Sequence, residues 1–241
     1  IYDICTAKEL GISGNAIHFD NSNESLEIIR HSCAHLMAQA IKSLYPEAQF
    51  FVGPVVDEGF YYDFKVDSKI GEEDLARIES AMRELAKKAY PITKTTLPRA
   101  QVEKRFANDE LKRAVMSRIT SDELSIYAQG DCEDLCMGPH LPITALLEHF
   151  KLTKIAGAYL GGDEKAQMLT RIYGIAFADK ASLKTYLYQL EEAKKRDHRK
   201  LGQEMELFTF DEEIGAGLPI WLPKGARLRK NIENLLTKAL I

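Results

Sequence analysis

Apolar residues recur at helical spacing early in the chain, over residues 23–44. The apolar stripe consists of Leu26, Ile29, Cys33, Met37, Ala40 and Leu44. Its period of three to four residues predicts an amphipathic helix, with Asn23 as the N-cap and Pro46 just beyond its end. At about 100° per residue, His31 and His35 share one face of this helix, nearly opposite the stripe.

The next two segments are rich in β-branched and aromatic residues, QFFVGPVV at 49–56 and GFYYDF at 59–64. They predict a hairpin or two adjacent strands. Residues 71–90 predict a second helix, because acidic residues stand at its start and lysines at its end, as the helix dipole favours. The further predicted elements are a strand at 92–97, a helix from Pro98 through Phe106, strands at 152–160 and 168–177, and a long helix from about Asp179 past Leu190.

Helices and strands that follow one another without a regular βαβ order predict an α+β fold, in which helices pack on an antiparallel sheet. The composition changes near residue 200, after the basic run KKRDHRK, and a loop rich in Gly and Pro precedes a last amphipathic helix. We therefore expect an N-terminal appendage at 1–22, a folded domain at 23–178, a linker helix at 179–205 and the start of a further domain at 206–241.

The composition of the 241 residues is 45% hydrophobic and 28% charged, which is enough apolar material for a sizeable core. The formal net charge of −4 is no global sign of nucleic-acid binding, so such a surface must come from local basic clusters. Four cysteines are too few for a disulfide scaffold, which favours a reducing, cytoplasmic setting. No apolar run is long enough to span a membrane. Because the chain begins with Ile1 rather than Met, we expect an excised or processed piece.

Two pairs of residues have the spacing of metal ligands. His31 and His35 form H-x3-H on the first helix, and Cys136 and His140 form C-x3-H in DLCMGPH. Together they are a plausible set of three or four ligands. Ser32 stands where the zincin motif H-E-x-x-H needs its glutamate, so that class of protease is excluded. The alternative is that both helix histidines are ordinary solvated side chains.

Other polar residues point to a pocket. Asp134 can accept the ammonium group of a ligand or cap a loop, and Tyr62 can border a pocket or simply pack in the core. Lys112 lies in the charged stretch DELKRAVM, where a solvated lysine is the default. The basic run contributes Lys194, Lys195, Arg196, Arg199 and Lys200. It can meet an RNA backbone or cover a solvated helix.

Five motifs between about residues 25 and 205 resemble the editing region of bacterial threonyl-tRNA synthetases. In the family's order they are RHSCAHLMAQAIK, GPVVDEGFYYDF, EDLCMGPHLP, HFKLTKIAGAYLGGDEKAQMLTRIYGIAF and LEEAKKRDHRKLG. The tail from Glu206 resembles the opening of the same family's class II catalytic domain, and the chain stops before most of the aminoacylation site. The chain departs from the family at Leu160 and Gly161, where the common form has Trp and Arg.

The resemblance implies the second additional domain of threonyl- and alanyl-tRNA synthetases as the fold, and proofreading as the function. A synthetase cannot exclude serine from a threonine site by size, since the absence of one methyl group discriminates by only ~10–200-fold. The implied activity is hydrolysis of the ester of mischarged seryl-tRNA(Thr), which spares the threonyl ester. The implied partner is tRNA(Thr), and no membrane association is expected.

The resemblance also implies a role for each site residue. His31 would orient or deprotonate a water molecule, and Lys112 would activate that water or stabilise the oxyanion. Asp134 would hold the α-ammonium group and Tyr62 would border the pocket. His35 is the third expected catalytic residue, and Cys136 and His140 would line the site. The basic run would contact the tRNA.

No metal is expected for editing, because the resemblance implies a metal-free pocket in the threonyl enzymes, whereas related alanyl sites use the same kind of residues for zinc. If a metal is present, its expected ligands are His31, His35, Cys136 and His140. For the full-length enzyme the resemblance implies ATP, magnesium, a zinc ion in the catalytic domain and a homodimer formed through that domain. Two alternatives stay open: a zinc-dependent aminoacyl-tRNA deacylase of the alanyl type, and a tRNA-binding module without activity.

Overall fold

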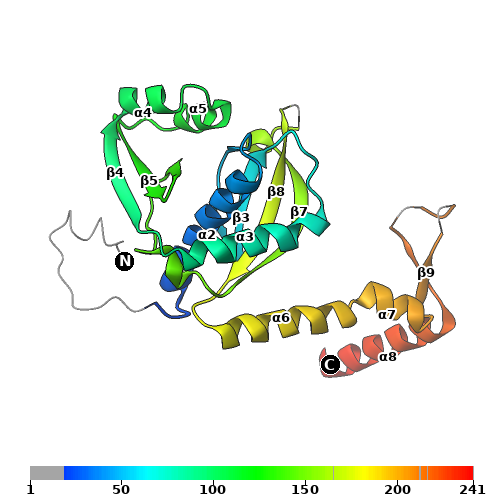
Figure 1. The fold of residues 1–241 in the computed structure, drawn as a ribbon. Coiled ribbons are helices and arrows are strands. Elements are labelled where there is room, and N and C mark those ends of the chain that lie inside the picture. Colours follow the sequence, from blue (N-terminus) through cyan, green and yellow to red (C-terminus); the bar gives the residue numbers. More distant parts are fainter. Residues whose placement is uncertain (1–18, 165, 212, 216, 241) are drawn as a thin grey trace. The chain divides into compact units, whose positions relative to one another are not determined.

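The structure is a computed structural model that describes residues 19–164, 166–211, 213–215 and 217–240. Of the predicted appendage at 1–22, residues 1–18 therefore lie outside the described residues. The chain divides into two compact units, residues 1–183 and 184–241 (Figure 1). The boundaries expected at 22, 178 and 205 divide the chain more finely than these two units do.

The first unit is built around a five-stranded antiparallel sheet. Its strands are β1 (Gln49–Phe50), β2 (Val55–Val56), β3 (Gly59–Lys65), β7 (Phe150–Tyr159) and β8 (Met168–Ala176). Their order is β1-β3-β8-β7, and β2 forms a hairpin with β3. The helices α2 (Asn23–Leu44) and α3 (Leu75–Lys87) pack on one face of this sheet, and a 3-10 turn at Glu72–Asp74 precedes α3 (Figure 1).

The largest core lies between this sheet and the two helices. Phe60, Tyr62 and Phe64 alternate along β3 and all face the core, as the two-residue period of a strand requires. Ile78 and Met82 of α3 meet them from the other side. The N-cap of α2 is Ser22, whose hydroxyl accepts a hydrogen bond from the Ser25 amide, so the predicted cap is wrong by one residue.

A second, three-stranded antiparallel sheet has the order β4-β5-β6. Its strands are β4 (Ile92–Pro98), β5 (Glu123–Gln129) and β6 (Cys132–Leu135), and the connection from β4 to β5 contains α4 (Arg99–Arg105) and α5 (Glu110–Met116). Val102, Met116, Leu124 and Ile126 give this part a small core of its own. The α+β prediction with antiparallel sheets and packed helices is confirmed.

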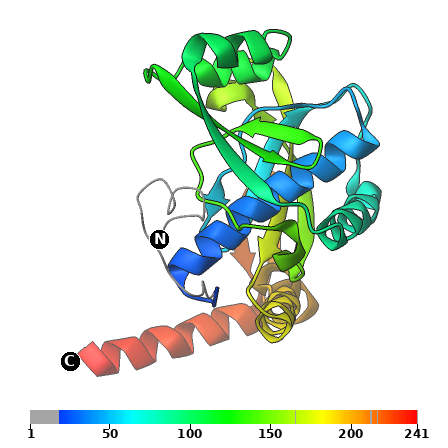
Figure 2. The same ribbon diagram turned by 60° about the vertical axis from the view of Figure 1, so that its left-hand side comes forward.

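Helix α2 lies between the two sheets (Figure 2). Every residue from Ile28 to Ile41 is buried except His31, which is partly exposed. The apolar stripe faces the five-stranded sheet, while Gln39 on the opposite side hydrogen-bonds the backbone of β5. The expectation that the histidine face is solvated is therefore wrong for His35, because a second sheet covers a face that looks polar in the sequence.

The second unit contains two helices, a hairpin and a last helix. They are α6 (Lys180–Lys195, which begins in the first unit), α7 (His198–Glu204), β9 (Phe208–Phe210), β10 (Pro219–Trp221) and α8 (Pro223–Leu240). The single linker helix predicted at 179–205 is thus two helices. Asp197 separates them, because its carboxylate caps α7 through the Arg199 amide. Among the described helices, none combines the length and apolar character needed to cross a membrane.

Candidate active site between the two sheets

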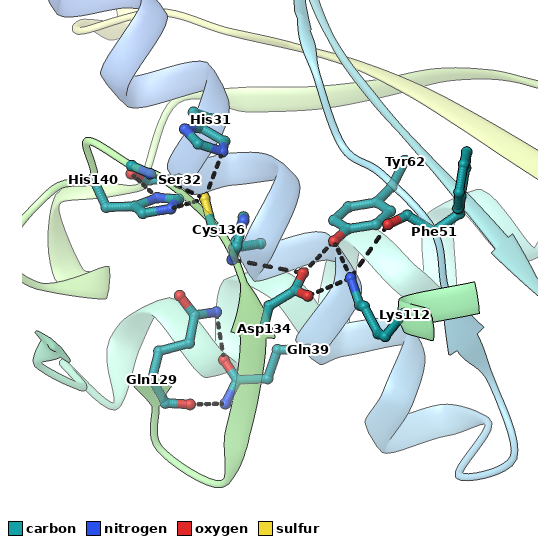
Figure 3. Close-up of polar contacts among 12 residues, drawn as sticks. His31, Ser32, Gln39, Phe51, Tyr62, Lys112, Gln129, Asp134, Cys136 and His140 are labelled. Atoms are coloured by element: carbon teal, nitrogen blue, oxygen red, sulfur yellow. Dashed lines mark hydrogen bonds and ion pairs between the residues drawn. The ribbon is translucent and has the colours of Figure 1, made fainter. Parts of the chain in front are cut away.

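Four side chains meet on the α2 face that looks toward the three-stranded sheet. His31 and His35 come from α2. Cys136 and His140 follow β6, and Figure 3 shows them beside His31. The Sγ atom of Cys136 lies 3.2 Å from Nε2 of His31 and 3.2 Å from Nε2 of His140. One donor atom from each residue lies within 4.8 Å of the others, so the structure brings the two sequence pairs together.

Ser32 holds this cluster in place from inside α2. Its hydroxyl oxygen accepts a hydrogen bond from the Leu141 amide at 2.9 Å and lies 3.2 Å from Nδ1 of His140. Ser32 is fully buried, so these contacts satisfy a hydroxyl that would otherwise be costly in a helix interior. In the sequence, Ser32 stands out only as a missing glutamate.

A second cluster joins Tyr62, Lys112 and Asp134 (Figure 3). The Tyr62 hydroxyl donates to Oδ2 of Asp134, and the Lys112 ammonium group forms an ion pair with Oδ1. Lys112 also donates to the Phe51 carbonyl oxygen at 3.3 Å. It is only 3% exposed, so the default of a solvated lysine is wrong. Asp134 belongs to strand β6, and its carboxylate serves an ion pair and no loop cap.

His35 connects the two clusters. Its Nδ1 atom lies 4.0 Å from Oδ2 of Asp134, and its ring packs edge-to-face on His140 with 4.3 Å between the ring centroids. Burial lowers the pKa of His35 and of His140 well below the usual histidine value, and burial also lowers the pKa of His31. The three imidazoles are therefore neutral at neutral pH. Burial is the main cause of a raised pKa of Tyr62, and the negative charge of Asp134 is the second cause. The phenol therefore stays protonated and donates its hydrogen bond.

A pair of amides forms part of the same interior. The side chain of Gln39 donates to the Gln129 carbonyl oxygen at 3.0 Å, and the Gln129 amide donates back to Gln39 at 3.1 Å. These bonds tie α2 to the strand that precedes β6 (Figure 3). Neither glutamine is among the residues predicted from the sequence, although Gln39 lies four residues after His35 and so continues the histidine face of the helix.

The arrangement offers a definite set of chemical groups. A buried carboxylate can bind a cationic ligand, a buried ammonium group can stabilise an anion, and a partly exposed neutral imidazole can accept a proton. The three imidazoles and one thiol also have the donor set of a tetrahedral zinc site.

Similarity to known proteins agrees with this geometry. Residues 124–173 match the family described as the threonyl and alanyl tRNA synthetase second additional domain. The threonine–tRNA ligase of Helicobacter hepaticus is 80% identical over 240 residues, a coverage of 100% of this chain. The threonine–tRNA ligases of Helicobacter acinonychis and Helicobacter pylori (strain J99) are each 64% identical over the whole chain.

Over its whole length the chain is similar to threonine–tRNA ligases. It spans about two fifths of the length of these relatives, 40% of the first and 41% of the other two. The part that matches the second additional domain includes Asp134, Cys136 and His140, and α2 brings His31 and His35 to it. The resemblance to this family and its editing region is confirmed.

The two departures from the common form of the family lie together on the surface of the first unit. Leu160 packs against the small core of Phe51, Leu111 and Leu169. Gly161 has φ +67°, a conformation that glycine tolerates best, and a Cβ atom there would collide with the Arg118 guanidinium group. Arg118 therefore occupies the space beside residue 161 in this chain.

The five residues of the basic run lie in the second unit and are all exposed. Lys195 and Arg196 contact Glu192, Arg199 contacts Asp197, and Lys200 lies 3.8 Å from Glu204. Four of the five charges thus have a carboxylate nearby, which lowers the positive potential expected from the sequence.

Proposed function

We propose that this chain hydrolyses the ester bond of mischarged seryl-tRNA(Thr) and spares the threonyl ester. The observation that carries the proposal is the meeting of a buried Lys112–Asp134 ion pair with neutral imidazoles around Cys136, between two sheets of an editing-type domain. An ester of the terminal ribose is activated, so its hydrolysis requires a positioned water molecule, a proton acceptor and stabilisation of the oxyanion.

Asp134 is the proposed partner of the substrate's α-ammonium group. In the structure its carboxylate holds the ammonium group of Lys112 and the hydroxyl group of Tyr62. The substrate ammonium and Lys112 are cations of the same kind, so they compete for this carboxylate. A substrate that takes over Asp134 leaves the Lys112 ammonium group beside the ester, where it stabilises the developing oxyanion.

His31 is the proposed proton acceptor, because it is the partly exposed member of the histidine cluster and its lowered pKa keeps the ring neutral. Water attacks the ester carbonyl carbon and its proton passes to His31. The bond between that carbon and the ribose oxygen then breaks, and the proton moves to the ribose oxygen. The products are serine and tRNA with a free terminal hydroxyl group. His35 and His140 hold the cluster in position through their packed rings.

Tight packing supports the exclusion of threonine. A cavity beside His35 and Asp134 has a volume of about 10 Å³, which is room for a single water-sized group. Tyr127 and Ala38 are among its walls. The additional methyl group of threonine has no matching space there, so the threonyl ester would sit away from the water and the proton acceptor.

The experiment that tests the proposal compares two esters of the same tRNA. The purified chain is incubated with seryl-tRNA(Thr) and threonyl-tRNA(Thr), and the disappearance of each ester is followed over time against a no-protein control. Rapid release of serine with retention of threonine supports the proposal. Equal hydrolysis of both esters contradicts the proposed selectivity, and tRNA binding without hydrolysis of either ester favours a binding module without activity.

We propose that editing requires no metal, and a zinc-dependent deacylase is the second candidate. The second candidate is favoured by the four donor atoms within 4.8 Å of one another. The positive charge of Lys112 would repel a dication, but Asp134 balances that charge and weakens the objection to zinc. If zinc binds, His31, His35, Cys136 and His140 would hold it, and the metal would supply a water molecule of lowered pKa.

For the full-length protein we propose ligation of threonine to tRNA(Thr) with ATP, as the names of the relatives support. Magnesium, a zinc ion in the catalytic domain, a homodimer formed through that domain and a cytoplasmic location belong to the same proposal. The basic run in the second unit is the proposed contact with the tRNA backbone.

A further inference from the structure

The hairpin of β2 and β3 lies beside His31 and is weakly held by its own strand pairing. Strand β2 is two residues long, and among the described strands it pairs with β3 alone. A pair this short is marginally stable by itself. The turn consists of Asp57 and Glu58, and neither residue has a positive φ. Two-residue turns that match the twist of a hairpin need a positive φ at their first residue, so this turn adds little order to the hairpin.

Arg30 of α2 binds the turn of this hairpin. Its Nη1 atom donates to the Asp57 carbonyl oxygen at 2.7 Å, and its Nε atom donates to the Ala176 carbonyl oxygen at 3.4 Å. The guanidinium carbon also lies 5.7 Å from the centre of the Phe177 ring. Arg30 is 7% exposed, so these charged hydrogen bonds form away from water, where they are strong. One side chain therefore joins the turn to α2 and to the end of β8.

The base of the same hairpin borders the proposed proton acceptor. Pro54 and Val55 line a cavity of about 300 Å³ together with His31. Arg30 and His31 are consecutive in α2, so their side chains leave the helix about 100° apart. Arg30 reaches the turn of the hairpin, and His31 faces its base. The position of the hairpin thus sets where Pro54 and Val55 stand beside the His31 ring.

Close packing fixes β3, so a movement of the hairpin is a movement of β2. Gly59 begins β3, and a Cβ atom there would collide with the Gly174 carbonyl oxygen of β8. The backbones of β3 and β8 are therefore in direct contact at this point, and β3 has no room to shift toward β8. Strand β2 carries Val55 at its start and ends at the turn that Arg30 holds. The contact of Arg30 with the turn therefore limits the strand that borders His31.

We propose that Arg30 is a positioning residue for ester hydrolysis, which holds the turn between β2 and β3 so that Pro54 and Val55 keep the His31 ring in place. The inference rests on the proposed function, because it takes His31 as the proton acceptor. Arg30 acts through the hairpin and not on the substrate. A displacement of about 1 Å at a reacting group can slow a reaction on the order of 10²-fold, so a contact of this kind is sufficient to change the rate.

Arg30→Gln tests the proposal, with Arg83→Gln as the matched control. Arg83 likewise donates to two carbonyl oxygens and lies over an aromatic ring, but at the start of β7. Arg30→Gln should slow single-turnover hydrolysis of seryl-tRNA(Thr) about 10–100-fold and leave the Kd of uncharged tRNA(Thr) unchanged. Arg83→Gln should retain the wild-type rate. Arg30→Lys still has a donor for the Asp57 carbonyl oxygen, so its rate should lie between those of the wild type and Arg30→Gln.

A second pair of substitutions separates the hairpin from other effects of Arg30. Asp57→Asn with Glu58→Gly places an Asn-Gly dipeptide in the turn, which favours the turn geometry that orders a hairpin without outside support. Added to Arg30→Gln, these substitutions should restore most of the hydrolysis rate. They should also return the imidazole NMR signals of His31 to their wild-type positions, and this measurement needs no ester.

The proposal is overturned if Arg30→Gln hydrolyses the seryl ester at the wild-type rate, or if the new turn restores neither the rate nor the His31 signals. Thermal unfolding shows whether Arg30→Gln is folded at the assay temperature, and if it is not, the same comparison is made with Arg30→Lys. A chain that hydrolyses neither ester contradicts the proposed function. In that event the His31 signals alone decide whether Arg30 positions the hairpin, because they shift in Arg30→Gln and return with the new turn only if it does.

Discussion

The Sγ atom of Cys136 lies 3.2 Å from Nε2 of His31, although 105 residues separate them in the chain. This pair joins a helix packed on the five-stranded sheet to the segment that leaves the three-stranded sheet. The candidate site therefore depends on both sheets at once, and its residues can be tested separately for chemistry and for stability.

His31→Ala should slow hydrolysis of seryl-tRNA(Thr) on the order of 10²-fold, because the variant lacks the proposed proton acceptor. The rate is measured in a single-turnover deacylation assay at saturating protein. His149→Ala is the control, since His149 belongs to neither cluster. Thermal unfolding should show both variants folded, and a His31→Ala enzyme with the wild-type rate would remove His31 from the mechanism.

Asp134→Ala should abolish seryl-ester hydrolysis and also destabilise the first unit. A role in holding the substrate's ammonium group would by itself involve a loss of activity without unfolding, but the structure shows that the change leaves the Lys112 ammonium group buried without its carboxylate. Breaking a buried ion pair on one side costs about 3–5 kcal/mol. Urea unfolding measures this decrease in stability.

Two further variants decide whether loss of the Lys112–Asp134 ion pair causes the decrease in stability. Asp131→Ala removes an exposed carboxylate from the neighbouring turn and should leave stability unchanged. Adding Lys112→Met to Asp134→Ala should recover most of the stability, because no unpaired charge then remains buried. A double variant as unstable as the single one would show that another interaction of Asp134 matters more.

Removal of metal should leave the hydrolysis rate of the purified chain unchanged. The measurement is dialysis against EDTA, a metal analysis of the protein and a deacylation assay before and after addition of zinc. Cys136→Ser serves as the comparison, because it removes the thiol from the four-donor cluster. If EDTA abolishes activity, zinc restores it, and the metal content of Cys136→Ser falls, then the cluster is a zinc site.

The free energy of unfolding should fall as the pH drops below about 6.5, the ordinary histidine pKa. The pKa values of His35 and His140 are lower in the folded chain, so the unfolded chain takes up protons there that the folded chain does not. Each histidine contributes up to about 1.4 kcal/mol per pH unit to the slope of this decrease. Its contribution to the free energy of unfolding is complete above about pH 6.5 and declines below it.

The contribution of His140 is isolated by difference. Urea unfolding is measured between pH 8 and pH 5 for the wild type, for His140→Gln and for the control His198→Gln, whose side chain is 86% exposed. His140→Gln should show a smaller decrease in stability on acidification, and the control should follow the wild type. Parallel curves for all three proteins would contradict a lowered pKa of His140.

Neutralising the basic run should weaken tRNA binding and its salt dependence. Glutamine is introduced at Lys194, Lys195, Arg196, Arg199 and Lys200, and log K is measured against log salt. The slope should change by about 0.9 for each duplex phosphate that the variant no longer neutralises. The total change should correspond to fewer than five phosphates, because four of these charges have a carboxylate nearby. Neutralising Lys87 and Lys88 at the end of α3 is the control. An unchanged affinity would remove this surface from the proposed tRNA interface.

The candidate site shows how far local pattern can reach. The helical spacing places His31 and His35 on one face, and the C-x3-H spacing selects Cys136 and His140, so all four members of the cluster are found in the sequence. Ser32 and the glutamine pair are missed, because a polar residue in a helix carries no local sign of what will cover it. For the same reason, local pattern alone makes Lys112 a solvated side chain, although it is buried.

The sequence by itself determined the two helices and the long strands of the five-stranded sheet and the α+β class, because apolar period, caps and turn residues act over a few positions along the chain. It also determined which residue types are available for chemistry. Only the tertiary structure decided that a second sheet covers the polar face of α2, which buries His35 and sets Asp134 against Lys112. Burial and pairing depend on residues far apart in the chain, and these alone decide which histidines are neutral and which lysine is held inside.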